Sequence, residues 1–400
     1  MVSKTLQGIK SIEELDLKEK NVFIRVDFNV PMDGDKITDD NRIQAALPTI
    51  RYALDKGARI MLASHLGRPK GKVNMEYSLE PVGAHLSDLL NLDVVLIDEL
   101  RSDAPKALFK GWKDGQILLL QNLRFDPDEE KNGHDLAQAI SEYTDVYIND
   151  AFGASHRAHS SIVALPQEIK ERGVGFLMKK EIEFLDKILY DHETPFMTIL
   201  GGAKVSDKIG VIENLIDKVD VFLVGGAMAY TFQAAQGLPV GDSLVEKDKI
   251  KFAGELIERV KARNKKILLP VDHIVVPAFD KVDEAKPTEG VAIPEGWMGV
   301  DIGPKTQAIY REEIKRAKTV FWNGPMGVFE KEPLAKGTFT VAQALADNQD
   351  AMTIVGGGDS AAAAKASGLA DKMKHISTGG GASLEYLQGD KLPGIEAVRS

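Results

Sequence analysis

Short apolar runs alternate with longer amphipathic segments along the whole chain, and this alternation constrains the fold more than any other feature. The longer segments carry apolar residues at helical spacing. In residues 40–57, for example, Ile43, Leu47 and Ile50 lie on one face and Gly57 is a natural C-terminal stop. Nearly continuous apolar strands that alternate with helices are typical of parallel sheets covered on both faces. We therefore predict an α/β protein.

The apolar runs form two groups, and at 400 residues the chain exceeds what one hydrophobic core usually organises. Candidate strands are residues 22–28, 58–64, 93–97, 116–123 and 145–152 in the first half, and 196–202, 220–227, 266–276, 319–324, 351–358 and 375–381 in the second. We predict an N-terminal domain over residues 1–175 and a C-terminal domain over 195–388. The helical pattern of residues 176–194 predicts a connecting helix and hinge between them.

Composition excludes several classes of function. The 60 Asp and Glu against 50 Lys and Arg give a net charge of −10, which repels nucleic acid. Without cysteine there is no disulfide, thiolate metal site or cysteine nucleophile. The longest nearly apolar stretch, residues 221–232, is shorter than the roughly 20 residues of a membrane helix, and the N-terminus lacks the apolar core of a secretory signal. We expect a cytoplasmic protein without nucleic-acid or membrane partners.

Cationic and polar side chains follow the strands of the first half, where ligands of open α/β sheets bind. They are Asp27 and Asn29, then Arg42 at the start of a helix, His65 and Arg68, Arg124, and His156, Arg157 and His159. Any one of them could simply form a local ion pair or cap a turn. Their coincidence at successive strand ends of an acidic protein favours a site for a ligand with several negative charges, because Arg grips phosphate and carboxylate.

Glycine-rich turns follow the strands of the second half, and several together favour a bound nucleotide because backbone N–H groups can approach phosphate there. Lys204 and Lys208 could hold the β- and γ-phosphates, and Asp359 could hold Mg²⁺. Alternatively, the lysines are exposed helix residues and Asp359 is an N-cap. Residues 356–361 also match the dinucleotide pattern G-x-G-x-x-A, but no strand ending in an acidic residue follows about 20 positions later. A nicotinamide-dependent dehydrogenase and a non-catalytic phosphometabolite-binding protein remain alternatives.

Nine sequence blocks together resemble the phosphoglycerate kinases, glycolytic enzymes, along essentially the full chain. The blocks are RVDFNVP (25–31), DDNRI (39–43), ASHLGRPKG (63–71), NLRF (122–125), NDAFGASHRAHSS (149–161), ILGGAKVSDKI (199–209), WNGPMGVFE (322–330), VGGGDS (355–360) and STGGGASLEYL (377–387). The resemblance implies two Rossmann-like domains, each a parallel β-sheet covered by helices. It further implies a monomer, and a C-terminal tail, residues 389–400, that folds back onto the N-terminal domain.

The resemblance also implies the site residues. Those for 3-phosphoglycerate are Asp27, Phe28, Asn29, Arg42, His65, Leu66, Gly67, Arg68, Arg124 and Arg157. Those for MgATP or MgADP are Lys204, Lys208, Gly225, Gly226, Gly299, Asn323, Glu330, Gly357, Gly358, Asp359 and Ser360. Ser360 stands where we associate Thr with the family, and either residue offers a hydroxyl at a helix start.

The implied reaction is reversible, Mg²⁺-dependent phosphoryl transfer between 1,3-bisphosphoglycerate and ADP, giving 3-phosphoglycerate and ATP by direct in-line transfer on domain closure. The catalytic residues would be Arg42, Lys204, Lys208, Gly357 and Gly380, with Mg²⁺ on Asp359. A carboxylate acceptor is already ionised, so no general base is needed. We therefore expect the histidines to donate hydrogen bonds to the ligand rather than to move protons.

Overall fold

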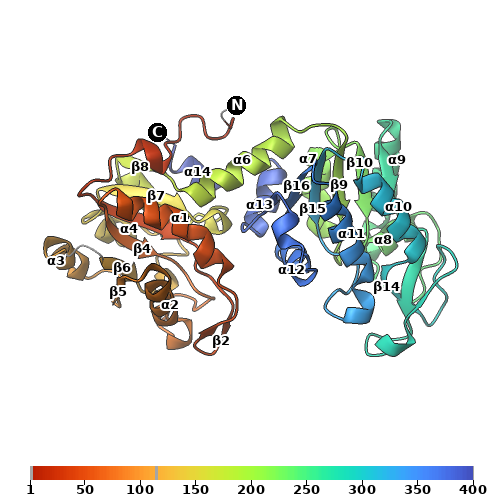
Figure 1. The fold of residues 1–400 in the computed structure, drawn as a ribbon, viewed down its shortest axis with the longest axis horizontal. Helices are drawn as coiled ribbons and strands as arrows, with labels where there is room; N and C mark the ends of the chain where they lie inside the picture. The colour runs from red at the N-terminus through yellow and green to blue at the C-terminus, as the bar shows by residue number, and fades with distance from the viewer. Residues whose placement is uncertain (1–2, 113–115, 400) are drawn as a thin grey trace. The chain divides into compact units, whose positions relative to one another are not determined.

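The computed structural model describes residues 3–112 and 116–399 (Figure 1). The chain divides into two compact units, Met1–Glu183 with Lys391–Ser400, and Phe184–Asp390. The division falls inside helix α6 (Phe176–Tyr190), in the segment predicted as the connector but eight residues past the predicted end of the N-terminal domain. Within the described ranges, no helix combines the length and the apolar character needed to cross a membrane.

The N-terminal unit is built on a six-stranded parallel sheet of order β5-β6-β4-β1-β7-β8 (Figure 1). Its strands are β1 (Asn21–Val26), β4 (Arg59–Ala63), β5 (Asp93–Ile97), β6 (Gln116–Leu120), β7 (Val146–Asp150) and β8 (Glu171–Val174). Its helices are α1 (Asn41–Asp55), α2 (Glu80–Leu90), α3 (Ala104–Lys110), α4 (His134–Ser141), α5 (Leu165–Glu168) and α14 (Pro393–Glu396), and β2 (Met32–Asp33) pairs with β3 (Lys36–Ile37). Strand β8 was not predicted, because its polar residues break the apolar pattern.

The core of this unit follows the predicted periodicities. Helix α1 buries Ile43, Leu47 and Ile50 at helical spacing, and they pack in one cluster with Ile24 and Ile60 of the central strands. The central strands are buried on both faces because helices cover the sheet on either side. The predicted α/β class is confirmed.

The second unit repeats this architecture in a sheet of order β11-β10-β9-β15-β16-β17, again wholly parallel. Its strands are β9 (Phe196–Leu200), β10 (Val221–Val224), β11 (Lys266–Leu268), β15 (Thr319–Asn323), β16 (Met352–Val355) and β17 (His375–Ile376). Its helices are α7 (Ile209–Leu215), α8 (Met228–Ala235), α9 (Ile250–Ala262), α10 (Pro304–Ile314), α11 (Lys336–Asp347), α12 (Gly358–Ala366) and α13 (Gly381–Leu387). Ile199, Leu223 and Trp322 lie in its core.

A small antiparallel sheet of order β13-β12-β14 was not predicted. It consists of β12 (His273–Val276), β13 (Lys286–Pro287) and β14 (Met298–Ile302). The prediction of one strand over residues 266–276 was wrong, because β11 ends before Pro270, which has no N–H for a sheet ladder. Asp272 then accepts hydrogen bonds from the backbone N–H groups of Lys305 and Thr306, so it caps α10 instead of extending a strand.

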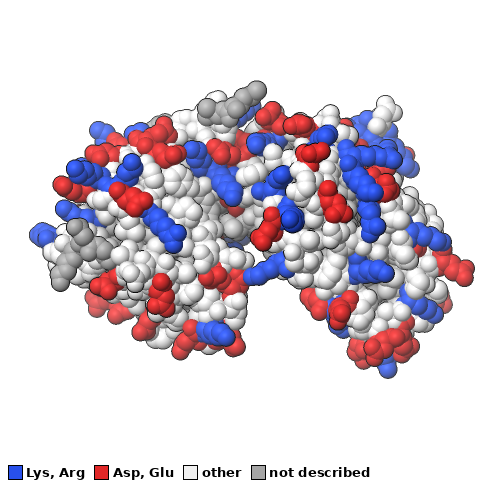
Figure 2. All heavy atoms as spheres, in the orientation of Figure 1, with Lys and Arg blue, Asp and Glu red and all other residues white. Residues whose placement is uncertain are grey.

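Figure 2 shows Lys and Arg interspersed with Asp and Glu on the face of each unit that it draws, so the acidic excess does not form one continuous patch there. An anionic ligand therefore needs cations gathered locally, and the ends of the strands are where they gather.

The C-terminal residues lie against the N-terminal unit. The Asn149 amide donates to the carbonyl oxygen of Gly394 at 3.0 Å, and the Gly394 N–H donates to the Ser155 carbonyl at 2.9 Å. A β-carbon on Gly394 would lie 2.8 Å from side-chain atoms of Ile162 and Ser155, so the approach requires glycine. Arg172 adds a bond to the carbonyl of Arg399.

We predict that Asn149→Ala lowers the free energy of unfolding by about 2–3 kcal/mol, because buried groups lose their partners. The Asn149 side chain is fully buried, and it also bonds the Ser155 hydroxyl and the Ala151 N–H. Denaturant titration measures the change, and Gln138→Ala on the exposed face of α4 is the control. Equal stability of the two variants would show that Asn149 does not hold the tail.

Candidate active site

The carboxyl ends of β1 and β4 bring the first predicted site residues together. Asp27 follows β1 and accepts a hydrogen bond from the Arg42 guanidinium at 2.6 Å, which fixes that side chain at the start of α1. The side-chain oxygen of Asn29 accepts the Gly67 N–H at 2.9 Å, and the Phe28 N–H donates to Ser64. These bonds tie the loop after β1 to the loop after β4.

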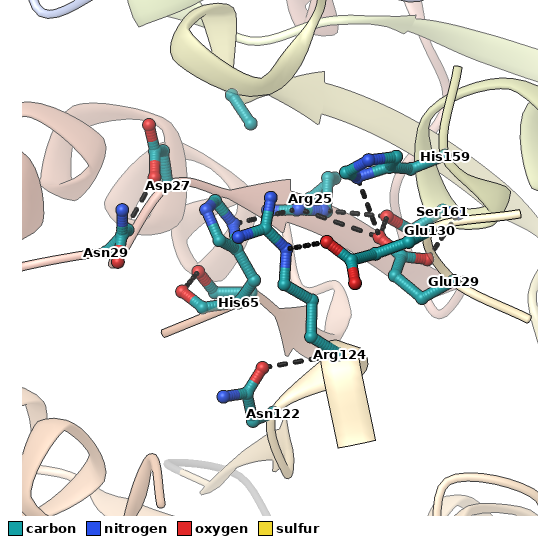
Figure 3. Close-up of polar contacts among 12 residues, drawn as sticks. Arg25, Asp27, Asn29, His65, Asn122, Arg124, Glu129, Glu130, His159 and Ser161 are labelled. Atoms are coloured by element: carbon teal, nitrogen blue, oxygen red, sulfur yellow. Dashed lines mark hydrogen bonds and ion pairs between the residues drawn. The ribbon is translucent and has the colours of Figure 1, made fainter. Parts of the chain in front are cut away.

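The short helix η3 (Leu123–Phe125) adds Arg124 to the same cluster (Figure 3). Its Nη1 donates to the carbonyl of Gly67 at 2.8 Å, and its Nε lies 3.5 Å from a carboxylate oxygen of Glu130. Asn122 caps η3 and also donates to the Leu66 carbonyl, so it links the loops after β6 and β4. Burial lowers the pKa of Arg124.

A buried charge network that the sequence analysis missed lies beneath this cluster (Figure 3). Arg25 and Glu129 are both fully buried, with 3.8 Å between Arg25 Nη2 and Glu129 Oε1. Arg25 also donates to the Ser161 hydroxyl at 2.8 Å, and that hydroxyl donates to Glu129 at 2.6 Å. The one available signal was an arginine inside the apolar run VFIRVDF.

Arg25 determines the proton position of His65. Its Nη2 lies 3.2 Å from His65 Nδ1, and since a guanidinium can only donate, Nδ1 must be the acceptor. Burial, aided by the positive charges of Arg25 and Arg124, keeps the pKa of His65 well below its usual value. His65 is therefore neutral, with its proton on Nε2, and is a hydrogen-bond donor there.

The other residues predicted for the 3-phosphoglycerate site differ in their exposure to solvent. Arg68 and Arg157 are exposed, whereas Phe28 and Leu66 are buried and offer only backbone groups. Arg157 lies near enough to help lower the pKa of His159. The basic cluster thus combines anchored and exposed arginines with two neutral histidines: it consists of Arg25, Arg42, His65, Arg68, Arg124, Arg157 and His159.

In the second unit, glycines allow the loops after β9, β10 and β15 to interlock. The N–H of Gly202 donates to the Pro325 carbonyl, and that of Gly226 to the Met326 carbonyl, both at 2.9 Å. Gly226 has φ +64°, and a β-carbon there would lie 2.5 Å from the Gly202 nitrogen. The loops of this edge can approach closely only because these positions lack side chains.

Lys208 is held beside the β15 and β16 ends. Its ammonium donates to the Asn323 side-chain oxygen, and the Asn323 amide donates to the Gly356 carbonyl at 2.6 Å. The Ser360 hydroxyl accepts the Gly324 N–H at 2.6 Å. Burial lowers the pKa of Lys208, against the charges of Asp207 and Asp359.

The glycine turns beside this network have open backbone. Gly357 has φ +92°, and a β-carbon on it would lie 2.7 Å from the Asn323 amide nitrogen. Gly358 begins α12 with open space where a side chain would stand. Gly380, the N-cap of α13 at φ +54°, also has open space there. Asp359 directly follows Gly358 and is exposed, and so is Lys204 in the loop after β9.

Gly299 and Glu330 lie with the small antiparallel sheet. Gly299 is in β14, donates to the Ser243 hydroxyl at 2.9 Å, and leaves no room for a side chain because the Tyr230 hydroxyl would lie 2.1 Å from a β-carbon. Glu330 is exposed, two residues after Val328, which bonds the Val300 carbonyl. Gly225 instead donates to the Leu200 carbonyl between β9 and β10.

A metal ion beside the glycine turns of the second unit would take most of its coordinating oxygens from a bound phosphate ligand. Across the described part of the chain, no three His, Asp or Glu side chains gather as a metal site. Mg²⁺ commonly uses one or two carboxylates together with phosphate oxygens. One exposed carboxylate, Asp359 in the first turn of α12, fits that donor set.

Sequence comparison decides the family. A model of the family described as phosphoglycerate kinase matches residues 12–390. The chain belongs to this family. It is 59% identical over 395 residues to a phosphoglycerate kinase of Bdellovibrio bacteriovorus, covering 99% of this chain and 98% of that protein. It is 55% identical over 393 residues to one of Anaeromyxobacter dehalogenans, covering 98% of this chain and 99% of that protein.

Solved structures agree with the sequence comparison. The phosphoglycerate kinase structure from Coxiella burnetii superposes with a TM-score of 0.88 at 41% identity, covering 98% of each chain. That from Pyrococcus horikoshii gives 0.83 at 34% identity, covering 97% of this chain and 98% of the other. The predicted pair of Rossmann-like domains and the predicted function, an ATP-dependent phosphotransferase of phosphoglycerate, are confirmed, and neither alternative function is favoured.

We predict that His159 makes the protein less stable in acid. Burial and neighbouring cations lower the pKa of His159 to about 3, so below about pH 6.5 the unfolded chain takes up a proton that the folded protein refuses. Relative to His159→Gln, the free energy of unfolding should fall by about 1 kcal/mol between pH 7 and 5.5.

The comparison with His159→Gln isolates the contribution of His159 to the pH dependence of stability. Burial raises the pKa of Asp150 to about 7, which stabilises the fold as pH falls in both proteins. Parallel pH profiles of unfolding for wild type and His159→Gln would contradict the prediction.

Proposed function

We propose that the chain transfers a phosphoryl group reversibly between 1,3-bisphosphoglycerate and ADP. The basic cluster would bind 3-phosphoglycerate. The magnesium nucleotide would bind at the glycine edge, which is the set of strand ends in the second sheet that carries Lys208 and the turns at Gly202, Gly226 and Gly357. The observation that carries the assignment of sites is the contrast between the two edges. One holds anchored Arg and His donors, and the other holds a half-buried lysine among glycine turns.

The basic cluster suits a small ligand with several negative charges. Arg42 and Arg124 supply anchored positive charge, and neutral His65 supplies a donor at Nε2. The exposed Arg68 and Arg157 add further positive charge. Guanidinium groups bind phosphate and carboxylate through paired hydrogen bonds. The loop contacts among Asn29, Gly67 and Arg124 keep this cluster organised without the ligand.

The glycine edge suits nucleotide phosphates. Lys208 already points a desolvated ammonium at a side-chain oxygen, so a phosphate oxygen can take the place of that partner. Gly357 and Gly358 lead into α12, whose N-terminus favours negative charge. Asp359 would hold Mg²⁺, which when bound neutralises charge on the nucleotide phosphates.

The chemistry needs positioning and positive charge more than proton transfer. A carboxylate oxygen of 3-phosphoglycerate attacks the γ-phosphorus of ATP, and the bond from that phosphorus to the bridging oxygen of ADP breaks. No proton moves in this step, which agrees with a neutral His65 whose pKa is held well below its usual value by burial. The positive charges of Arg42, Lys204 and Lys208 would offset the negative charge on the transferring phosphoryl group. Closure of the two domains on their substrates remains a prediction.

We predict that Arg42→Ala lowers kcat about 10³-fold, with little change in nucleotide affinity, because a charge that acts in the transition state is lost. ADP formation from MgATP, with and without 3-phosphoglycerate, measures it, and the wild type should turn over only with both substrates. The control is Arg51→Ala, an exposed arginine on the same helix. If Arg42→Ala keeps its kcat, Arg42 does not act on the transferring group.

We predict that Asp359→Asn raises the Mg²⁺ concentration needed for half-maximal rate by at least 10-fold, because Mg²⁺ prefers charged oxygen ligands. The affinity for 3-phosphoglycerate should be unchanged, as isothermal titration can show. Asp371→Asn, an exposed aspartate in η10 (Ala370–Lys372), is the matched control. An unchanged Mg²⁺ requirement in Asp359→Asn would remove this carboxylate from the metal site.

A further inference from the structure

The lysine loop, residues 202–208, is the stretch that carries both Lys204 and Lys208. Its first residue is fixed by the bond from the Gly202 N–H to Pro325, and its last by the bond from Lys208 to Asn323. Between these ends the loop forms no pairing with the main sheet, and Lys204 is exposed. Something else must hold its middle.

Glu246 holds the middle of the lysine loop. Its Oε2 accepts the backbone N–H groups of Val205 and Ser206, the latter at 3.2 Å, and its Oε1 accepts the Ser206 hydroxyl at 2.6 Å. Both carboxylate oxygens are therefore used on the two residues that directly follow Lys204. Forty residues of chain separate Glu246 from Ser206.

The segment that carries Glu246 is itself anchored. The Glu246 N–H donates to the hydroxyl of Thr231, a buried residue of α8, at 3.1 Å. The backbone N–H of Asp242 donates to the Trp297 carbonyl at 2.9 Å, and the Ser243 hydroxyl accepts the N–H of Gly299. Residues 242–246 thus connect the lysine loop to β14, which carries Gly299.

This contact changes what the lysine loop can offer a nucleotide. The N–H groups of Val205 and Ser206 lie at the start of the helical turn η6 (Ser206–Lys208). Backbone N–H groups at a helix start that have no partner would attract a phosphate. Glu246 already satisfies them with the protein's own carboxylate. The loop therefore presents its lysine side chains to the ligand, and these need a fixed backbone to be placed accurately.

We propose that Glu246 is a positioning residue for phosphoryl transfer, which orders the lysine loop and so places Lys204 against the transferring group. The proposal rests on the role given to Lys204 under the proposed function. Glu246 itself does not touch the substrates in this account. Its carboxylate acts on the rate only through the backbone of Val205 and Ser206.

Glu246→Ala should lower kcat about 10- to 100-fold, because a displaced catalytic group costs up to about that much. The dissociation constant of MgADP should change by less than about threefold, since the glycine turns and Lys208 remain. Glu246→Gln, which can still accept with one oxygen, should lose less. The matched control is Glu213→Gln on α7, which removes a carboxylate bonded twice to Arg259 without touching the loop.

A double-mutant cycle separates this proposal from the proposed function. If Glu246 acts through Lys204, adding Glu246→Ala to Lys204→Ala should reduce kcat by less than about threefold further. If Lys204→Ala alone is fully active, the role proposed for Lys204 fails, and this proposal with it. If Lys204→Ala is impaired but Glu246→Ala is fully active or fully additive, Glu246 is not the positioning residue, and the proposed function stands.

Amide hydrogen exchange gives a readout that does not depend on activity, and Ser206→Ala is a milder variant should Glu246→Ala fold poorly. Exchange at Val205 and Ser206 should be at least 10-fold faster in Glu246→Ala than in the wild type, with a smaller increase in Glu246→Gln and the strands of the sheet unchanged. Unchanged exchange at both amides would overturn the proposal.

Discussion

The parallel pairing of the strands is the constraint on which both sites depend. β1 pairs with β4 on one side and β7 on the other, so the residues that follow these strands emerge at one edge. The same holds for β9 between β10 and β15. At the first edge the loops carry Arg and His. At the second they are glycines whose backbones bond one another, as Gly202 does with Pro325. The loop sequences thus give two similar sheets different chemical groups at their edges.

The buried Arg25 shows how the first edge is kept organised. A charge inside a sheet is costly unless it is paired and hydrogen-bonded, and here Glu129 and Ser161 supply the partners. Arg25 also donates from Nη1 to the Val26 carbonyl and from Nη2 to His65. Arg25 therefore fixes the His65 ring and its tautomer, and its charge adds to burial in keeping the ring neutral. Glu246 has the corresponding task in the second unit, where it holds the backbone next to Lys204.

Local patterns predicted much of this molecule, and distant contacts were what they missed. The periodicity of α1 and the apolar run of β4 were enough to place those elements, and residues after strand ends such as Arg124 followed from the rule for parallel sheets. The small sheet around β12 was missed because its pairing is antiparallel and non-local. Three residues were missed, namely Arg25, Glu129 and Glu246. Each acts through hydrogen bonds to a residue 30 or more positions away, and no spacing in the sequence reveals such a contact.

Whether the two edges bind different ligands can be measured from the backbone amide chemical shifts on titration with each ligand alone. We expect 3-phosphoglycerate to shift amides of residues 27–29, 65–68 and 122–124, and MgADP to shift those of residues 202–208 and 357–360. Shifts from 3-phosphoglycerate confined to the glycine edge, or from MgADP confined to the basic cluster, would show that the assignment of the two sites is wrong.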